Sequence, residues 1–117
     1  MIVDDSASFL EASRTLLERN GLTVVGVASD AATAAQRTIE LRPDVVLLDI
    51  DLGDESGFDV AQQLTASPHC ADVRVILISA HREDDLAELV AESPALGFIA
   101  KSELSVRAIQ DLLDDSP

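Results

Sequence analysis

The sequence predicts a single α/β domain built around a parallel β-sheet. Short, uninterrupted apolar runs alternate along the 117 residues with segments whose apolar residues recur every three or four positions. Strands buried on both faces of a parallel sheet read as such continuous runs, and their regular alternation with helices is typical of α/β folds. The apolar fraction of 47% excludes disorder, and the length suits one domain with one core, at residues 1–117.

Five apolar runs predict the strands. They lie at residues 1–3, 22–28, 44–48, 74–78 and 97–100. The second run is rich in β-branched residues, which favour strands. Pro43 marks the turn into the third run.

Segments with helical spacing separate these strands and follow the last one. The first helix is predicted from the recurrence of Phe9, Ala12 and Leu16, with Leu10 and Leu17 beside them. The dipeptide Asn20-Gly21 predicts its end, because both residues accept the left-handed conformation that closes many helices.

The other four helices are predicted with less detail. Asp30 is expected to cap the second helix, whose inner face would carry Ala32, Ala35 and Ile39. The third helix is predicted at residues 58–66 and the fourth at residues 84–92. Ser105 is expected to cap the fifth, whose apolar residues are Val106, Ile109, Leu112 and Leu113.

Composition excludes several classes of function. The net charge is −14, from 22 acidic and 8 basic residues, which argues against nucleic-acid binding by this domain and against anionic membranes. The single cysteine, Cys70, excludes an internal disulfide. No apolar run approaches the ~20 residues of a membrane span, and no signal peptide is visible, so we expect a cytoplasmic location.

Polar side chains follow four of the predicted strands, at the point where each strand ends. Asp4 and Asp5 follow the first strand, Asp49 the third, Ser79 the fourth and Lys101 the fifth. Ligands of open α/β sheets bind beyond the carboxyl ends of the strands. Three carboxylates, one hydroxyl and one ammonium at this edge would form a divalent-cation site with a nucleophile, which indicates phosphoryl transfer.

The chain resembles the receiver domain of two-component response regulators. The resemblance rests on Val3-Asp4-Asp5, on Asp49 with Gly57 eight residues later, on Ser79-Ala80, and on Phe98 three residues before Lys101. It implies a flavodoxin-like, doubly wound five-stranded parallel sheet, strand order 2-1-3-4-5, with helices on both faces.

The resemblance implies a role for each acid of the cluster. Asp49 would be the phosphoacceptor. Asp5 and Asp49 would ligate Mg²⁺ directly and Asp4 through water, and the backbone carbonyl of Asp51 would complete the protein ligands. Mg²⁺ prefers octahedral oxygen ligands and pairs naturally with carboxylates and phosphate.

The remaining site residues would assist transfer and respond to it. Lys101 would pair with a phosphoryl oxygen, and Ser79 would donate a hydrogen bond to the phosphoryl group. Phe98 would be the aromatic switch that swings inward as Ser79 moves. Asp51 and His81, two residues beyond Asp49 and Ser79, would tune the lifetime of the phosphoaspartate.

The resemblance also implies partners. A sensor histidine kinase would donate the phosphoryl group and dock near the first helix. A homodimer or an output domain would contact the last strand and its flanking helices, and the output would be transcription. The domain would catalyse only its own phosphorylation and dephosphorylation, so it would not be an enzyme in the ordinary sense.

Three positions depart from the pattern of the family. Met1 stands where receivers have several more apolar residues, so we expect the chain to begin late in its first strand. Gly53 and Ser102 stand where proline is common, which predicts a mobile loop after Asp49 and removes the usual cis bond after Lys101. The run Lys-Ser-Glu-Leu-Ser is similar to receivers that control helix-turn-helix output domains.

Other interpretations remain open at this stage. Taken alone, Asp4 and Asp5 fit helix caps, Ser79 a strand-end hydroxyl, Phe98 a core residue and Lys101 a surface lysine. Asp49 is harder to explain so, because an unpaired carboxylate is costly to bury. A degenerate receiver would act only as an interaction module, and the run Asp49-Ile50-Asp51 also resembles the start of aspartate-nucleophile phosphatases. The absence of a Glu at position 12 of the loop from Asp49 excludes an EF-hand.

Overall fold

The computed structural model describes residues 1–68, 72–80 and 86–114. The strands are β1 (Ile2–Val3), β2 (Val27–Ala28), β3 (Val45–Asp49), β4 (Asp51–Leu52), β5 (Glu55–Ser56), β6 (Arg74–Ser79) and β7 (Gly97–Ala100). The helices are α1 (Ala7–Arg19), α2 (Ala31–Leu41), α3 (Gly57–Ala66), α4 (Ala87–Glu92) and α5 (Val106–Asp114), with a 3₁₀ turn η3 (Lys101–Glu103).

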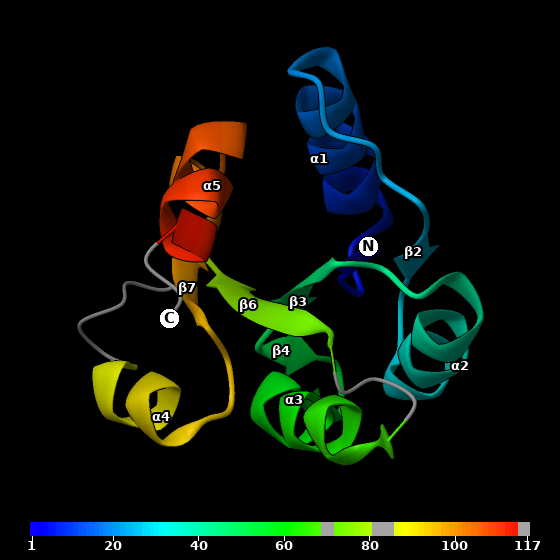
Figure 1. Cartoon of the computed structure of the whole chain (residues 1–117), viewed down its shortest axis with the longest axis vertical. Helices are drawn as coiled ribbons and strands as arrows, with labels where there is room; N and C mark the ends of the chain where they lie inside the picture. The colour runs from blue at the N-terminus through cyan, green and yellow to red at the C-terminus, as the bar shows by residue number, and fades with distance from the viewer. Residues whose placement is uncertain (69–71, 81–85, 115–117) are drawn as a thin grey trace.

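Five strands form one parallel sheet in the order β2-β1-β3-β6-β7. Counting these five strands along the chain, the order is 2-1-3-4-5, which confirms the predicted doubly wound topology. Helices α1 and α5 cover one face of the sheet, and α2, α3 and α4 cover the other (Figure 1). The carboxyl ends of β1, β3, β6 and β7 therefore share one edge.

The aliphatic core lies on both faces of the sheet. Val46, Leu48 and Leu77 pack beneath α2, α3 and α4, whereas Leu47 and Ile76 pack beneath α1 and α5. Successive residues of a strand point to opposite faces, so strands buried on both sides need an apolar residue at every position. This requirement explains the uninterrupted apolar runs.

The boundaries of four strands and one helix lie within one residue of the prediction. These are β1, β3, β6, β7 and α3. The backbone N–H of Ala108 donates to the Ser105 Oγ at 3.0 Å, so Ser105 does cap α5. The predicted start of the fourth helix at Asp84 lies outside the described residues, as does Cys70. No helix in the described part of the chain is long and apolar enough to cross a bilayer.

The apolar pattern predicted for the first helix is confirmed only in part. Leu17 is buried, and Phe9 and Leu10 are half-buried against the core. Ala12 is exposed, Leu16 is 41% exposed, and the polar Ser13 is buried instead. Ser13 is tolerated inside because its hydroxyl donates to the Phe9 carbonyl at 2.6 Å, a bond that hydroxyl side chains make within helices.

The second helix departs from the prediction for the same reason. Ala32 and Ile39 are exposed, Ala35 is half-buried, and the buried face carries Ala31, Ala34 and Thr38. The Thr38 hydroxyl donates to the Ala34 carbonyl at 2.6 Å. A hydroxyl that is hydrogen-bonded to its own helix can be buried, but a pattern that counts only apolar residues does not include it. The prediction therefore assigned the inner face to neighbouring positions.

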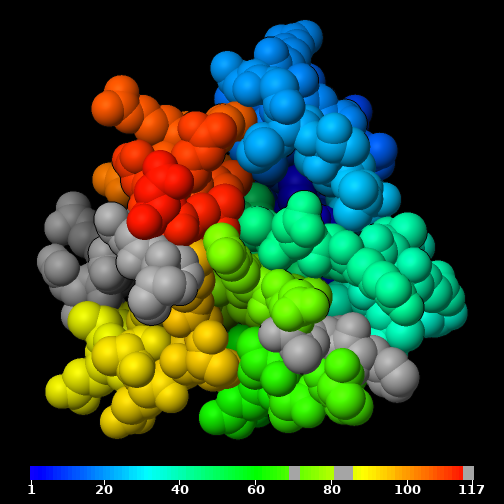
Figure 2. All heavy atoms as spheres, in the orientation of Figure 1, coloured from blue at the N-terminus to red at the C-terminus, as the bar shows by residue number. Residues whose placement is uncertain are grey.

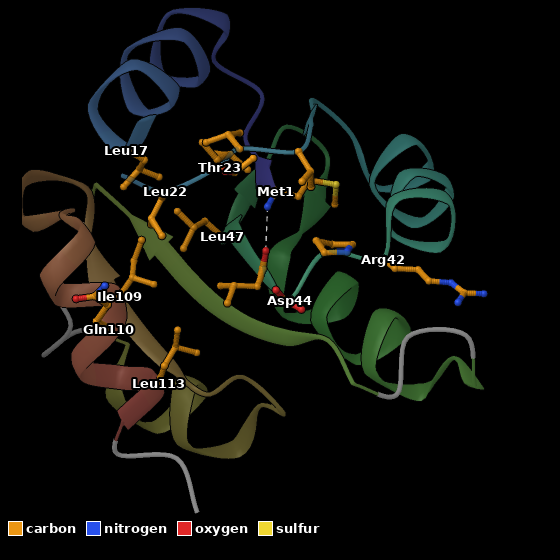
Figure 3. A pocket seen from close by; sticks show the side chains of 15 residues that line it. Met1, Leu17, Leu22, Thr23, Arg42, Asp44, Leu47, Ile109, Gln110 and Leu113 are labelled. Atoms are coloured by element: carbon orange, nitrogen blue, oxygen red, sulfur yellow. Dashed lines mark hydrogen bonds between the residues drawn. The ribbon is translucent and has the colours of Figure 1, made fainter. Parts of the chain in front are cut away.

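The second strand is shorter than predicted. Residues 22–28 were expected to form it, but only Val27 and Ala28 pair, because the adjacent β1 has two residues and offers no further partner. Residues 22–25 instead border a cavity of about 360 Å³ between α1, the start of β3 and α5. Met1 lies at its wall, where its ammonium donates to the Val45 carbonyl at 2.9 Å (Figure 3).

This cavity lies at the amino ends of the strands. Its lining is mostly apolar and includes Leu17, Leu47, Ile109 and Leu113. The space-filling view shows the dark blue N-terminal segment at the floor of a hollow below α1 (Figure 2). The cavity contains none of the polar strand-end residues, so the functional site must be sought at the opposite edge of the sheet.

Candidate functional site

Three carboxylates meet at the carboxyl edge of the sheet. Asp4 and Asp5 follow β1 directly, and Asp49 is the last residue of the adjacent β3, whose Leu48 pairs with Val3. One oxygen from each of the three side chains lies within 4.8 Å of the others. Asp4 and Asp49 are buried, whereas Asp5 is exposed. The structure thus brings together the three acids that the strand ends predicted.

Asp4 is the most enclosed of the three acids. Its Oδ1 accepts the backbone N–H of Ser6 at 2.8 Å, and the Ser6 hydroxyl in turn accepts the N–H of Phe9 as the cap of α1. Its Oδ2 lies 2.6 Å from the Lys101 ammonium. Among the described residues, however, no donor meets this buried oxygen with hydrogen-bond geometry. The contact is therefore an ion pair, and the oxygen keeps the capacity to bind another cation.

Lys101 lies where β7 ends and η3 begins, next to the acid cluster. It is the only lysine in the sequence. Its ammonium is 3.2 Å from the Asp49 Oδ2 and 4.4 Å from the centre of the Phe9 ring. Burial acts to lower the pKa of Lys101, but its contacts with Asp4 and Asp49 outweigh that effect and raise the pKa above its ordinary value. The lysine stays charged at any physiological pH.

Asp49 is a buried carboxylate under opposing influences. Burial is the largest of them and raises its pKa, the negative charge of Asp4 raises it further, and the pKa reaches about 6. The backbone N–H of Asp51 donates to its Oδ1 at 3.1 Å and, like Lys101, acts in the opposite direction. The carboxylate is therefore ionised at neutral pH, but its surroundings stabilise the negative charge less well than water does.

Gly57 allows the backbone to close beneath Asp49. Its N–H donates to the Ile50 carbonyl at 2.7 Å. A Cβ at this position would lie 2.2 Å from the Asp49 carbonyl oxygen and 2.5 Å from the Ile50 Cα, which is closer than atoms can approach. The spacing between Asp49 and Gly57 that the sequence displayed thus has a steric cause.

The loop after Asp49 contains a hairpin that the sequence did not predict. Strands β4 and β5 pair antiparallel around Gly53, which has a φ of +63°. The Glu55 Oε1 accepts the backbone N–H of Ala31 at 3.3 Å, which ties the hairpin to the start of α2. Leu52 is buried in the core. Two-residue strands within an acidic loop leave no recognisable hydrophobic pattern.

The other predicted site residues fall into three groups. Ser79 ends β6 beside β3 and is fully buried, and Phe98 is buried in β7. Asp51 is exposed and directs its backbone N–H at Asp49. His81 lies outside the described residues.

The donors at this edge fit Mg²⁺. They are carboxylate oxygens, which Mg²⁺ prefers over nitrogen or sulfur. The closeness of Asp4, Asp5 and Asp49 and the hydrogen-bonding capacity left on the Asp4 Oδ2 both favour a hard cation between them. The Asp51 side chain is not part of this group of three.

Sequence reasoning missed one residue of the site, Phe9. Its ring lies below the Lys101 ammonium, at a distance typical of a cation–π contact. The spacing pattern had assigned Phe9 to the apolar face of the first helix. An aromatic residue in the first turn after Asp4-Asp5 was the only available signal.

The doubly wound sheet with an acid cluster and a lysine at its carboxyl edge defines a flavodoxin-like domain with a polar site. A family model described as the response regulator receiver domain matches residues 1–113. The chain belongs to this family, whose members are the phosphoacceptor domains of two-component regulatory systems.

Curated relatives carry the same kind of domain within longer proteins. The DNA-binding transcriptional activator EvgA of Escherichia coli is 28% identical over 103 residues, which cover 88% of this chain and 50% of EvgA. A protein-glutamate methylesterase/protein-glutamine glutaminase of Symbiobacterium thermophilum is 34% identical, over 91% of this chain and 29% of that protein. The chain thus spans half the length of EvgA and less than a third of the methylesterase.

Solved structures agree with the fold. A two-component response regulator of the LuxR family from Aurantimonas superposes with a TM-score of 0.85 at 29% identity, covering 97% of this chain and 83% of that one. The response regulator domain of Thermotoga maritima CheB gives a TM-score of 0.73 at 26% identity, covering 97% and 86%.

Proposed function

We propose that Asp49 is the phosphoacceptor of this receiver domain. One carboxylate oxygen would attack the phosphorus of a phosphohistidine on a sensor histidine kinase. The P–N bond would break, its electron pair would leave with the imidazole, and an acyl phosphate would form. The observation that carries the proposal is the buried Asp49 carboxylate, which lies 3.2 Å from an ammonium and beside two further carboxylates.

The neighbouring residues suit defined roles in this reaction. Asp4, Asp5 and Asp49 would hold Mg²⁺ together with the Asp51 carbonyl. The bound ion would supply positive charge for the phosphoryl oxygens. Lys101 would orient and neutralise the incoming group, and the buried Ser79 hydroxyl would donate a hydrogen bond to it once it is attached. A pKa of about 6 leaves Asp49 ionised, and so nucleophilic, at neutral pH.

Phosphorylation would then change the face formed by β7 and its flanking helices. Ser79 and Phe98 lie on the adjacent strands β6 and β7, where Ser79 pairs with Ala100 and Phe98 pairs with Leu77. Movement of Ser79 toward the phosphoryl group would free space for Phe98 to turn further inward. Asp51 and His81 would set how fast water removes the group.

The experiment is intact-mass spectrometry after incubation with acetyl phosphate and Mg²⁺. We expect one added phosphoryl group that is labile to base. Asp49→Ala should abolish it, whereas Asp111→Ala, an exposed acid on α5, should be labelled like the wild type. Equal labelling of wild type and Asp49→Ala would refute the assignment.

The whole protein would act as a transcriptional regulator. The name of EvgA, which carries a similar domain in half of its length, supports such an output, whereas the methylesterase relatives offer an enzymatic alternative. The domain itself would perform no catalysis beyond its own phosphorylation and dephosphorylation. Continuous release of phosphate from small phosphate esters would contradict this and favour a phosphatase.

A homodimer or an output domain would dock on β7 and the helices beside it. Helices α4 and α5 lie on opposite faces of the sheet; α5 is amphipathic, and Leu89 of α4 is 50% exposed. Size-exclusion chromatography of the wild type and of Leu89→Asp, with and without beryllofluoride, would test this. A dimer that is insensitive to both changes would exclude the surface.

A further inference from the structure

Among the described residues, the Lys101 ammonium has three close partners of two different kinds. It is 2.6 Å from the Asp4 Oδ2, 3.2 Å from the Asp49 Oδ2 and 4.4 Å from the centre of the Phe9 ring. The two carboxylates belong to the group that fits Mg²⁺. An aromatic ring, by contrast, is not a ligand for a hard cation that prefers oxygen. The ring is thus the one partner among these three for which the metal does not compete.

We propose that Phe9 is a positioning residue that keeps the Lys101 ammonium at the pocket when a divalent cation occupies the carboxylates. The inference rests on the proposed function, because it assigns a role to Phe9 only if Lys101 must face a phosphoryl group there. It adds an aromatic residue of the first helix to a site otherwise made of acids, a hydroxyl and a lysine.

The position of the ring is fixed by the fold. Phe9 lies in the first turn of α1, where its backbone N–H donates to the Ser6 hydroxyl at 3.3 Å. Ser6 in turn donates its own N–H to Asp4. The half-buried ring packs against the part of the core beneath α1 and α5. The same short segment therefore sets the positions of the metal-site acid and of the ring.

A divalent cation changes the balance of forces on Lys101. A bound cation would offset the negative charges of Asp4 and Asp49, which now attract the ammonium. The cation and the ammonium are both positive, so at a few ångström they would repel each other. Lysine has a flexible four-carbon stem, and the Lys101 side chain is already 20% exposed, so the ammonium could turn out to solvent. A cation–π contact opposes this, and it changes such an equilibrium about 2- to 5-fold when the pair is partly exposed.

Nuclear magnetic resonance of the only lysine tests the contact without any reaction. Lysine labelled with ¹³C at Cε gives a single methylene signal for this chain, and protons above an aromatic face are shifted upfield. We expect the Lys101 signal to lie upfield of its position in Phe9→Leu, both in EDTA and in excess Mg²⁺. An upfield shift that disappears when Mg²⁺ binds, or that is absent throughout, overturns the proposal.

The reaction provides a second test. At saturating Mg²⁺, Phe9→Leu should lower the rate of labelling by acetyl phosphate about 2- to 5-fold, and Phe9→Tyr should restore it because tyrosine keeps the aromatic face. In a Lys101→Ala background, Phe9→Leu should have no further effect. Leu10→Val, in the same turn of α1, should label at the wild-type rate. An equal effect of Phe9→Leu with and without Lys101 would mean that the ring only supports the fold, and would overturn the proposal.

The outcomes separate the two levels of inference. If the wild type takes up no phosphoryl group, or if Mg²⁺ shifts no backbone amide signal near Asp5, the proposed function fails and this inference fails with it. If labelling depends on Asp49 as expected, but Phe9→Leu changes neither the Lys101 signal nor the rate of labelling, only the proposed role of Phe9 is refuted.

Discussion

Replacing Asp49 by asparagine should stabilise the metal-free protein. In the folded state the pKa of Asp49 is raised from 3.8 to about 6, chiefly by burial and then by the charge of Asp4. This difference corresponds to about 3 kcal/mol of unfavourable free energy for the ionised carboxylate. This free energy already includes the opposing contact with Lys101, and solvent screening of the pocket reduces it. We expect a net increase of about 1–2 kcal/mol in the free energy of unfolding at pH 8 in EDTA.

The effect must depend on pH with a defined sign. Below pH 3.8 Asp49 is protonated in both the folded and the unfolded state, so its raised pKa has no influence on stability. Between pH 3.8 and about 6 only the unfolded state ionises, and the wild type loses stability as the pH rises. Above pH 6 the penalty is complete. The difference between Asp49→Asn and wild type should therefore grow from pH 4 to pH 6 and then level off.

Urea denaturation followed by far-ultraviolet circular dichroism measures this effect, since the chain has no tryptophan or tyrosine for fluorescence. Asp5→Asn is the control within the cluster, because Asp5 is exposed and should give a smaller gain. Asp111→Asn, exposed on α5, should change the free energy of unfolding by less than about 0.5 kcal/mol. The reasoning is refuted if Asp49→Asn is less stable than wild type in EDTA at pH 8, or if its advantage persists unchanged at pH 4.

Three further outcomes are expected. Mg²⁺ should stabilise the wild type by up to ~2.7 kcal/mol at one hundred times its dissociation constant and Asp49→Asn by less, which urea titrations with excess Mg²⁺ would reveal; equal stabilisation would remove Asp49 from the metal site. Gly57→Ala should lower the free energy of unfolding by about 1–3 kcal/mol and slow labelling, because a Cβ 2.2 Å from the Asp49 carbonyl oxygen must displace that backbone. A thermal melting curve identical to that of the wild type would contradict the close contact. Asp51→Asn and His81→Ala should change the half-life of the phosphorylated protein more than the extent of labelling, followed by intact mass after removal of the donor, and unchanged decay in both would place lifetime control elsewhere.

The sheet could be predicted because each of its buried strands needs an apolar residue at every position. The same reasoning failed for residues 22–26, although their composition is that of a strand. Pairing depends on a neighbour, and the neighbouring β1 begins only at Ile2, which pairs with Val27. A strand's own sequence therefore does not determine its length, because the hydrogen bonds that define it belong equally to another segment of the chain.

The inner face predicted for α2, and the places predicted for Ala12 and Leu16 in α1, were wrong for a different physical reason. Ser13 and Thr38 donate their hydroxyl protons to carbonyls of their own helices, so these residues can be buried without an external partner. A helix face read from apolar residues alone treats both as solvent-exposed. The error is systematic, because a serine or threonine in a helix can lie either on the buried face or on the exposed face.

The polar site shows what position along the chain can and cannot reveal. Asp4, Asp5, Asp49 and Lys101 could be placed together because parallel strands deliver the residues at their carboxyl ends to one edge. What those residues do to one another depends on distances and burial: the ion pair between Lys101 and Asp4, the raised pKa of Asp49 and the ring of Phe9 below the ammonium all follow from packing. The topology thus assembles the charges, and the surrounding side chains decide how far those charges compensate one another before a metal ion or a phosphoryl group arrives.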